Sequence, residues 1–117
     1  MGQKGWKVGI DMRVVRVQAN LQWSVQRGKV GAWVAICDPL KLTVQSETWA
    51  ELMEDIGLTL NDILKDLLVS NELPKFLHER GWQLAGAMPT RPEDVRFDVP
   101  FFPVMAGANG PQREFRQ

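Results

Sequence analysis

The chain has 117 residues, of which 44% are hydrophobic and 24% charged, with 14 Lys and Arg against 14 Asp and Glu. This length supports a single domain with one core, and zero net charge argues against a strong, unaided phosphate-binding role. Because no apolar run approaches the ~20 residues that cross a bilayer and no signal peptide is visible, we expect a cytoplasmic protein.

The charges are unevenly distributed along the chain. Residues 1–41 carry seven basic and two acidic side chains, whereas residues 47–72 carry one basic side chain, Lys65. The acids of this second stretch are Glu47, Glu51, Glu54, Asp55, Asp62, Asp66 and Glu72. They form either an ordinary solvated helix face or an acidic surface that attracts a basic partner.

Residues 1–12 are predicted to be a loose leader, and the first regular element is a strand over 14–26. In this stretch the odd positions from Val15 to Val25 are apolar, and the even positions from Arg16 to Gln26 are polar. Strict alternation over so many residues is typical of a strand with one buried face.

Two further strands follow. Glycines in "RGKVG" favour a hairpin turn, the run "AWVAIC" predicts the second strand, and Asp38-Pro39 ends it. The third strand is "KLTVQS", residues 41–46. Cys37 is the only cysteine, which excludes an internal disulfide and a zinc site built from sulfur alone, so we expect a buried, inert thiol.

A long helix is predicted from Thr48 to Leu68. Thr48 and Glu51 form a capping box, and nine apolar residues fall within an arc of about 160°. The helical phase continues through Gly57, which favours one helix, although a kink at this glycine stays open. Leu58 points away from the apolar arc and is either a stray exposed leucine or a docking residue.

The rest of the chain predicts a short helix and a last strand. Asn71 is the expected cap of this helix, Pro74 fits its first turn, and Gly81 its end. The stretch 95–104 reads as a strand that Pro100 and Pro103 confine to a sheet edge. Residues 105–117 are expected to be a flexible tail, too short for a DNA-binding domain.

These elements predict an α+β domain over residues 13–104. Its antiparallel sheet would have three to four strands, with the long and the short helix packed on one face. No other predicted element is large and apolar enough to cover the opposite face. That face is either ordinary exposed surface or an interface with another chain, and the phase of the second strand is open. The predicted interface residues are Gln18, Asn20, Gln22, Val34, Ile36 and Leu58.

The sequence carries no recognisable catalytic set. His78 is the sole histidine and is expected at the surface, far in sequence from Cys37. The predicted strands offer only Asp11, Asp38 and Asp98 as acids for a nuclease-like cluster. We therefore expect no enzyme activity, no catalytic, cofactor-binding or metal-ligating residue, and no cofactor.

Several segments resemble the HicB-like antitoxins of bacterial toxin–antitoxin pairs. The resemblance is carried by Gly31 and Trp33–Ala35 on the second strand, and by Thr48, Glu51 and Leu52 at the helix start. The later segments "DLL", "FLHERGW" and "FDVPF" extend it over roughly residues 13–104. It implies a fold related to double-stranded-RNA-binding domains, homo-oligomers, and a role in neutralising a small RNA-cleaving toxin. DNA binding by this chain alone is not expected.

Two functions follow as expectations. The first is a non-enzymatic, antitoxin-type module that oligomerises and masks a small basic ribonuclease, with the acidic helix steering the encounter. The alternative is an RNA-binding module in which Arg13, Arg16, Arg27 and Lys29 contact phosphates.

Overall fold

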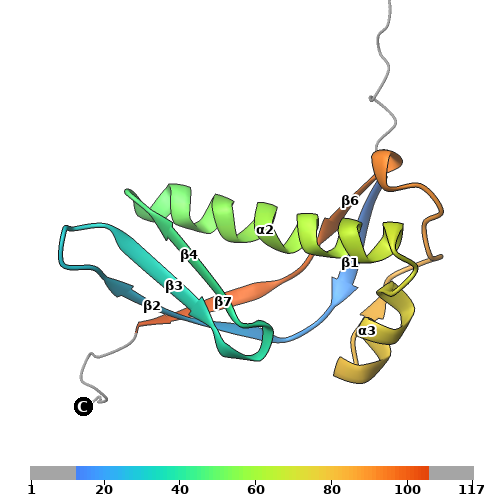
Figure 1. Cartoon of the computed structure of the whole chain (residues 1–117), viewed down its shortest axis with the longest axis horizontal. Coiled ribbons are helices and arrows are strands. Elements are labelled where there is room, and N and C mark those ends of the chain that lie inside the picture. Colours follow the sequence, from blue (N-terminus) through green and yellow to red (C-terminus); the bar gives the residue numbers. More distant parts are fainter. Residues whose placement is uncertain (1–12, 106–117) are drawn as a thin grey trace, which may run out of the picture. The chain divides into compact units, whose positions relative to one another are not determined.

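A computed structural model describes residues 13–105 (Figure 1). The predicted leader, and the predicted tail beyond Met105, lie outside the described residues. The described chain has two α-helices and two mixed sheets of three and four strands, which confirms the α+β class. It divides into two compact units: unit 1 comprises residues 13–19 and 59–99, and unit 2 comprises residues 20–58 and 100–105.

The four-stranded sheet belongs to unit 2. Its strands are β2 (Leu21–Arg27), β3 (Trp33–Cys37), β4 (Leu42–Ser46) and β7 (Phe101–Met105), in the order β4-β3-β2-β7. β3 is antiparallel to both β2 and β4, whereas β7 is parallel to β2. β7 is an edge strand, as its Pro103 predicts.

The turns between these strands form where glycine and proline predict them. Between β2 and β3, the Gly28 amide donates to the Ala32 carbonyl at 2.6 Å, and Gly31 takes a φ of 89° that glycine adopts without strain. Between β3 and β4, Asp38–Leu40 forms a 3₁₀ turn, η2. The two hairpins thus place β3 in the interior of the sheet.

Unit 1 holds the three-stranded sheet. Its strands are β1 (Arg13–Gln18), β5 (Gln83–Leu84) and β6 (Val95–Asp98), in the order β5-β1-β6, and a 3₁₀ turn, η3 (Pro92–Asp94), precedes β6. β1 is antiparallel to β5 and parallel to β6. The two-residue strand β5 was not anticipated from the sequence.

The prediction of one antiparallel sheet is wrong in two places. The strand expected over 14–26 is broken at residues 19–20, and β1 and β2 lie in different sheets. The strand expected over 95–104 is broken at Val99 and Pro100, which separate β6 from β7. Each half of the last segment runs parallel to one half of the first, so both sheets are mixed.

The long helix α2 spans Trp49–Val69 without interruption, so there is no break at Gly57. Thr48 caps it as predicted, because its Oγ1 accepts a hydrogen bond from the Glu51 amide at 3.1 Å. Residues 49–58 belong to unit 2 and residues 59–69 to unit 1. The sequence predicted a single domain, whereas in the structure the longest helix is shared between two compact units.

The short helix α3 spans Leu73–Arg80 and ends at Gly81, with φ 69°, as predicted. Asn71 does not cap it, since the residue before α3 is Glu72 and no side chain bonds the helix start. Asn71 instead adopts a left-handed conformation with φ 63°, and the Glu72 amide donates to the Leu67 carbonyl at 2.8 Å. This is the usual closure of a helix end, so Asn71 terminates α2.

Each unit has its own buried side chains, drawn largely from the predicted apolar positions. In unit 2 they include Trp23, Val25, Ala35, Cys37, Leu52 and Ile56. In unit 1 they include Val15, Val17, Leu60, Leu64, Leu73, Leu77, Val95 and Phe97. Unit 1 also buries Asn61, whose Oδ1 accepts a hydrogen bond from the Phe97 amide at 2.7 Å.

Candidate protein-interaction surface

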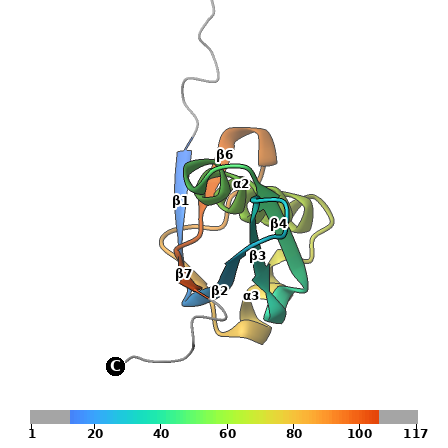
Figure 2. The same ribbon diagram turned by 90° about the vertical axis from the view of Figure 1, so that its left-hand side faces the viewer.

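One face of the unit 2 sheet is covered by the first half of α2. Trp49 packs edge-on against Trp33 of β3, with ring centroids 5.1 Å apart. At the other side of this contact the Ser46 hydroxyl of β4 donates to Asp55 Oδ2 at 2.5 Å. Figures 1 and 2 show the first half of the helix lying along one side of these strands. The inner face is therefore closed within unit 2.

The opposite face of the same sheet is defined by the strand register. Side chains that are paired across neighbouring strands share a face, and the pairs Gln26–Val34 and Ser24–Ile36 fix the outer side of β2 and β3. The pairings of β4 and β7 extend this side in both directions. We call it the neutral face: Gln22, Ser24, Gln26, Val34, Ile36, Thr43, Gln45, Phe102 and Val104.

No side chain of the neutral face is charged, although it spans four strands. Its apolar members are accessible: Phe102 is 42% exposed, Val104 is 40% exposed, and Val34 and Ile36 are half-buried. A sheet face in contact with water usually carries polar and charged residues. An uncharged, partly apolar face is instead typical of the centre of a protein–protein interface, from which charged residues are depleted.

Unit 1 supplies an internal comparison. The register of β1 with β6 pairs Val14 with Arg96 and Arg16 with Asp98 on its outer face. Arg16 Nε lies 3.5 Å from Asp98 Oδ2, and both side chains are more than half exposed. This face has the charges of a solvated surface, which the neutral face lacks.

The structure brings together three of the six predicted interface residues: Gln22, Val34 and Ile36 lie on the neutral face. Gln18 lies on β1 in unit 1, and Asn20 is exposed in the connection before β2. Leu58 is on α2 and 42% exposed, so it does point outward.

The sequence reasoning missed Phe102 and Val104. All five residues of "FFPVM" are apolar, so this run by itself does not show which side chains face outward; the register with β2 does. These two residues supply the most exposed apolar groups of the neutral face.

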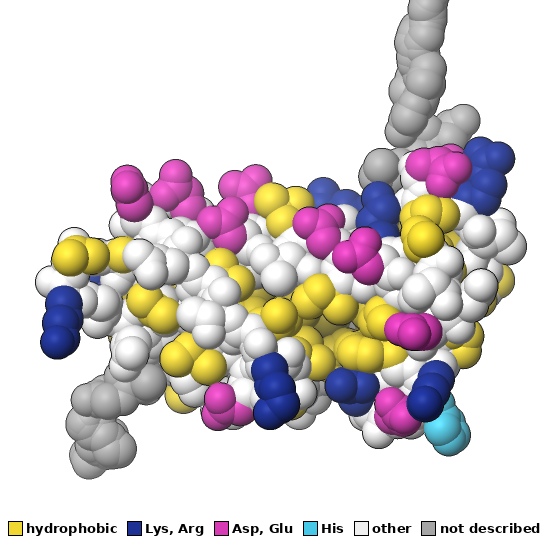
Figure 3. All heavy atoms as spheres, viewed as in Figure 1, with side chains coloured by type: hydrophobic (Ala, Val, Ile, Leu, Met, Phe, Trp, Pro, Cys, Tyr) yellow, Lys and Arg dark blue, Asp and Glu magenta, His cyan; other side chains and the backbone are white. Residues whose placement is uncertain are grey.

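Acidic side chains gather along α2 (Figure 3). Glu51, Glu54, Asp62 and Asp66 are exposed, whereas Asp55 is half-buried beside Ser46. Within residues 13–105, the ion pairs closer than 4 Å involve none of these acids. Lys65 is the one basic residue of α2, so the helix carries an excess of negative charge, and its acids form no close ion pair within the described chain.

The basic residues proposed for RNA binding are engaged within the chain. Arg13 Nη2 donates to the Ala87 carbonyl at 2.9 Å, and Arg16 pairs with Asp98. The Arg27 guanidinium lies 4.6 Å from the ring centroid of Trp33. Three of the four candidate phosphate contacts therefore already have partners, and they are divided between the two units.

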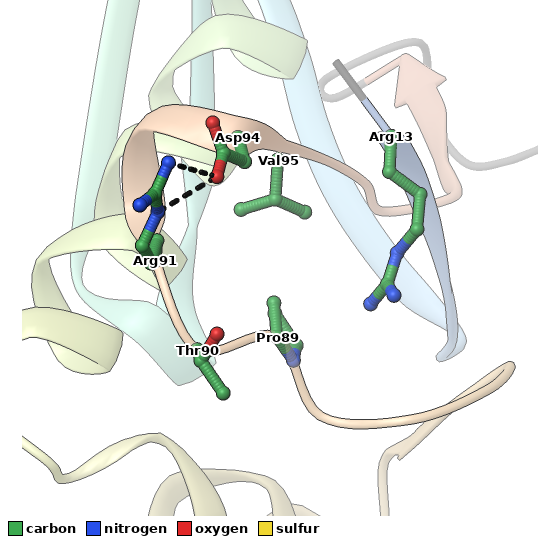
Figure 4. A pocket seen from close by; sticks show the side chains of 6 residues that line it. All are labelled: Arg13, Pro89, Thr90, Arg91, Asp94 and Val95. Atoms are coloured by element: carbon green, nitrogen blue, oxygen red, sulfur yellow. Dashed lines mark hydrogen bonds and ion pairs between the residues drawn. The ribbon is translucent and has the colours of Figure 1, made fainter. Parts of the chain in front are cut away.

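A hollow of about 480 Å³ in unit 1 is lined by Arg13, Pro89, Thr90, Arg91, Asp94 and Val95 (Figure 4). Arg91 donates from Nε and Nη2 to Asp94 Oδ2, both at 2.8 Å. The hydrogen bond to Asp94, with the nearby charges of Asp94 and Glu93, raises the pKa of the Arg91 guanidinium. The Arg91 guanidinium and the Asp94 carboxylate are thus paired with each other in the lining of the hollow.

The remaining titratable candidates are Cys37 and the acids Asp11, Asp38 and Asp98. Cys37 is buried, and burial raises the pKa of its thiol, so the thiol is held in its protonated, unreactive form. Asp38 belongs to unit 2 and Asp98 to unit 1, whereas Asp11 lies outside the described residues. In the stretch 13–105 no three His, Cys, Asp or Glu side chains cluster so as to hold a metal ion.

No protein-family model, curated protein or solved structure matches the chain. The resemblance to HicB-like antitoxins therefore rests on the quoted residues alone. Among the described helices none is long and apolar enough to cross a membrane.

Proposed function

We propose that the chain is a non-enzymatic protein-binding module that receives another polypeptide on the neutral face of unit 2. The observation that supports this most strongly is a four-stranded sheet surface without a single charge. Burying such a surface requires no desolvation of charged groups, which is a principal cost of association. The exposed Phe102 and Val104 would gain most from burial.

The partner we propose is a small basic ribonuclease, which makes the module antitoxin-like. The resemblance to HicB-like antitoxins suggests this class, and the excess of acids over Lys65 on α2 supports it. A negatively charged helix accelerates the encounter with a basic protein, whereas a neutral contact surface holds the complex by burial. The salt concentration should accordingly affect association more than dissociation.

The experiment compares two lysine substitutions in cells that express the protein encoded by the neighbouring gene, which under this proposal is a small basic ribonuclease. Ile36→Lys places a charge in the centre of the neutral face, and Val14→Lys places one on the outer face of unit 1, where charges already lie. We expect the wild-type chain and Val14→Lys to restore growth and to co-purify with the ribonuclease, and Ile36→Lys to do neither. Equal rescue by Ile36→Lys, with normal folding, would contradict the proposal.

A further inference from the structure

The four sheet edges of the described chain are not equally protected. An exposed strand edge presents free backbone amides and carbonyls, so proteins shorten, charge, cover or interrupt edge strands to prevent pairing with other chains. The edge strands here are β5 and β6 in unit 1, and β4 and β7 in unit 2.

Three of these edges carry an identifiable block. β5 has only two residues. In β6 the Phe97 amide is already bonded to Asn61 Oδ1 at 2.7 Å. β7 has Pro103 at its centre, which removes one donor.

β4 carries none of these blocks. Its sequence, Leu42–Ser46, contains no charge and no proline, and among the described residues its backbone pairs with β3 alone. Thr43 and Gln45 are exposed along it. β4 is thus the unprotected edge of the described chain.

The residues that flank β4 make this edge self-complementary. Two copies of β4 can pair antiparallel about a two-fold axis that passes through Val44. Each residue before Val44 then faces the residue that lies equally far after Val44 in the second copy. Thr43 thus faces Gln45 of the second copy. Lys41 and Glu47 flank the strand at its two ends, so the Lys41 end of each copy lies beside the Glu47 end of the other. No like charges meet, and opposite charges at both ends of the pair favour this register. An axis one residue to either side would place Lys41 or Glu47 opposite a neutral residue.

We propose that two copies of the chain pair through β4 in this register, joining two unit 2 sheets into one continuous sheet. Identical edges related by a two-fold axis satisfy each other completely, whereas a foreign strand would need its own matching charges. The contact is narrow, so the dimer is expected to be weak, with a dissociation constant on the order of micromolar. The pairing uses the edge of the sheet and does not depend on the function of its neutral face.

Charge reversal tests the register. In sedimentation equilibrium, we expect Lys41→Glu and Glu47→Lys each to weaken dimerisation about tenfold or more, since two favourable pairs become two repulsive pairs. The double variant Lys41→Glu/Glu47→Lys should return to the wild-type dissociation constant. Lys29→Glu, which changes the net charge equally on an exposed loop of the same unit, should leave it unchanged.

Disulfide formation provides a second measurement. In the proposed pair the two Val44 Cα atoms lie about 4.5–5.5 Å apart, within the range that a disulfide spans. Val44→Cys should therefore cross-link under mild oxidation, whereas the wild type, which has only the buried Cys37, should not. Val104→Cys on the neutral face is the matched control. A monomer at all concentrations, failure of the double charge reversal to restore pairing, or cross-linking through position 104 instead of 44 would overturn the proposal.

Discussion

Replacing Asn61 with alanine should destabilise unit 1 by an amount that the structure allows us to estimate. Asn61 is 9% exposed, and its Oδ1 accepts the hydrogen bond of the Phe97 amide at 2.7 Å. Its removal leaves a buried amide without a partner, which costs about 1–3 kcal/mol. Alanine recovers about 0.5–0.7 kcal/mol through its higher helix propensity. The net loss is therefore about 0.3–2.5 kcal/mol.

Two measurements check this estimate. In urea unfolding, Asn61→Ala should lower the midpoint with an unchanged slope, and the melting temperature should fall by roughly 1–20 °C. Hydrogen exchange of the Phe97 amide should accelerate, because its acceptor is gone. The control is Asp62→Ala, one residue along the same helix and exposed, which should leave stability unchanged or raise it slightly.

An unchanged unfolding free energy for Asn61→Ala, together with unchanged exchange at Phe97, would refute the reasoning. It would mean that the amide finds another partner and that Asn61 does not protect the β6 edge.

The other predictions concern α2 and Cys37. Thr48→Ala should lower the free energy of unfolding by about 1 kcal/mol, measured by thermal unfolding, because the Glu51 amide loses its acceptor. Thr48→Ser should retain most of that stability. Equal melting temperatures of the wild type and both variants would contradict the role of Thr48 as the helix cap. Gly57→Ala should raise the unfolding free energy by about 0.5–1 kcal/mol, since a Cβ at Gly57 would meet no atom within 4 Å. A loss of stability would show that the position is crowded. Burial raises the pKa of the Cys37 thiol in the folded chain. Above about pH 8.5 the thiol of the unfolded chain therefore loses its proton first, which favours the unfolded state. The free energy of unfolding should then fall by at most about 1.4 kcal/mol per pH unit. Cys37→Ala should remove this component of the pH dependence, and an identical slope in both chains would contradict it.

The elements that the sequence predicted well are those with strong local signals. The alternation of buried positions from Val15 to Val25 holds on both sides of the break at residues 19–20. The capping box at Thr48 and the end of α3 at Gly81 are also local, because each needs only neighbouring residues. Periodicity and capping chemistry are sufficient for such features.

The errors concern strand continuity and pairing. A two-residue break leaves the alternation in phase, so periodicity alone could not show that β1 and β2 lie in different sheets. The parallel pairs β1–β6 and β2–β7 join segments about eighty residues apart, and no local pattern specifies them. Asn71 was misassigned because asparagine serves both as a helix cap and as a left-handed terminator.

The candidate surface was only partly predictable for the same reason. Val34 and Ile36 were identified from the hydrophobic run of the central strand, whereas Phe102 and Val104 required the parallel register of β7. The sequence also gave no sign that Gln18 and Gln22 would lie in different sheets. Asn61 lies about 20° beyond the apolar arc of α2, at the edge of the buried stripe. The helical phase could therefore have identified it as a buried polar residue.

The most direct test of the account is the affinity of the purified chain for the proposed partner, the small basic ribonuclease, measured by titration calorimetry with matched variants. A charge buried at the centre of an interface costs at least about 2 kcal/mol, so Ile36→Lys should weaken binding roughly 30-fold or more. Val14→Lys should bind as the wild type does. Unchanged affinity for Ile36→Lys, or an equal loss for Val14→Lys, would contradict the claim that another polypeptide docks on the neutral face.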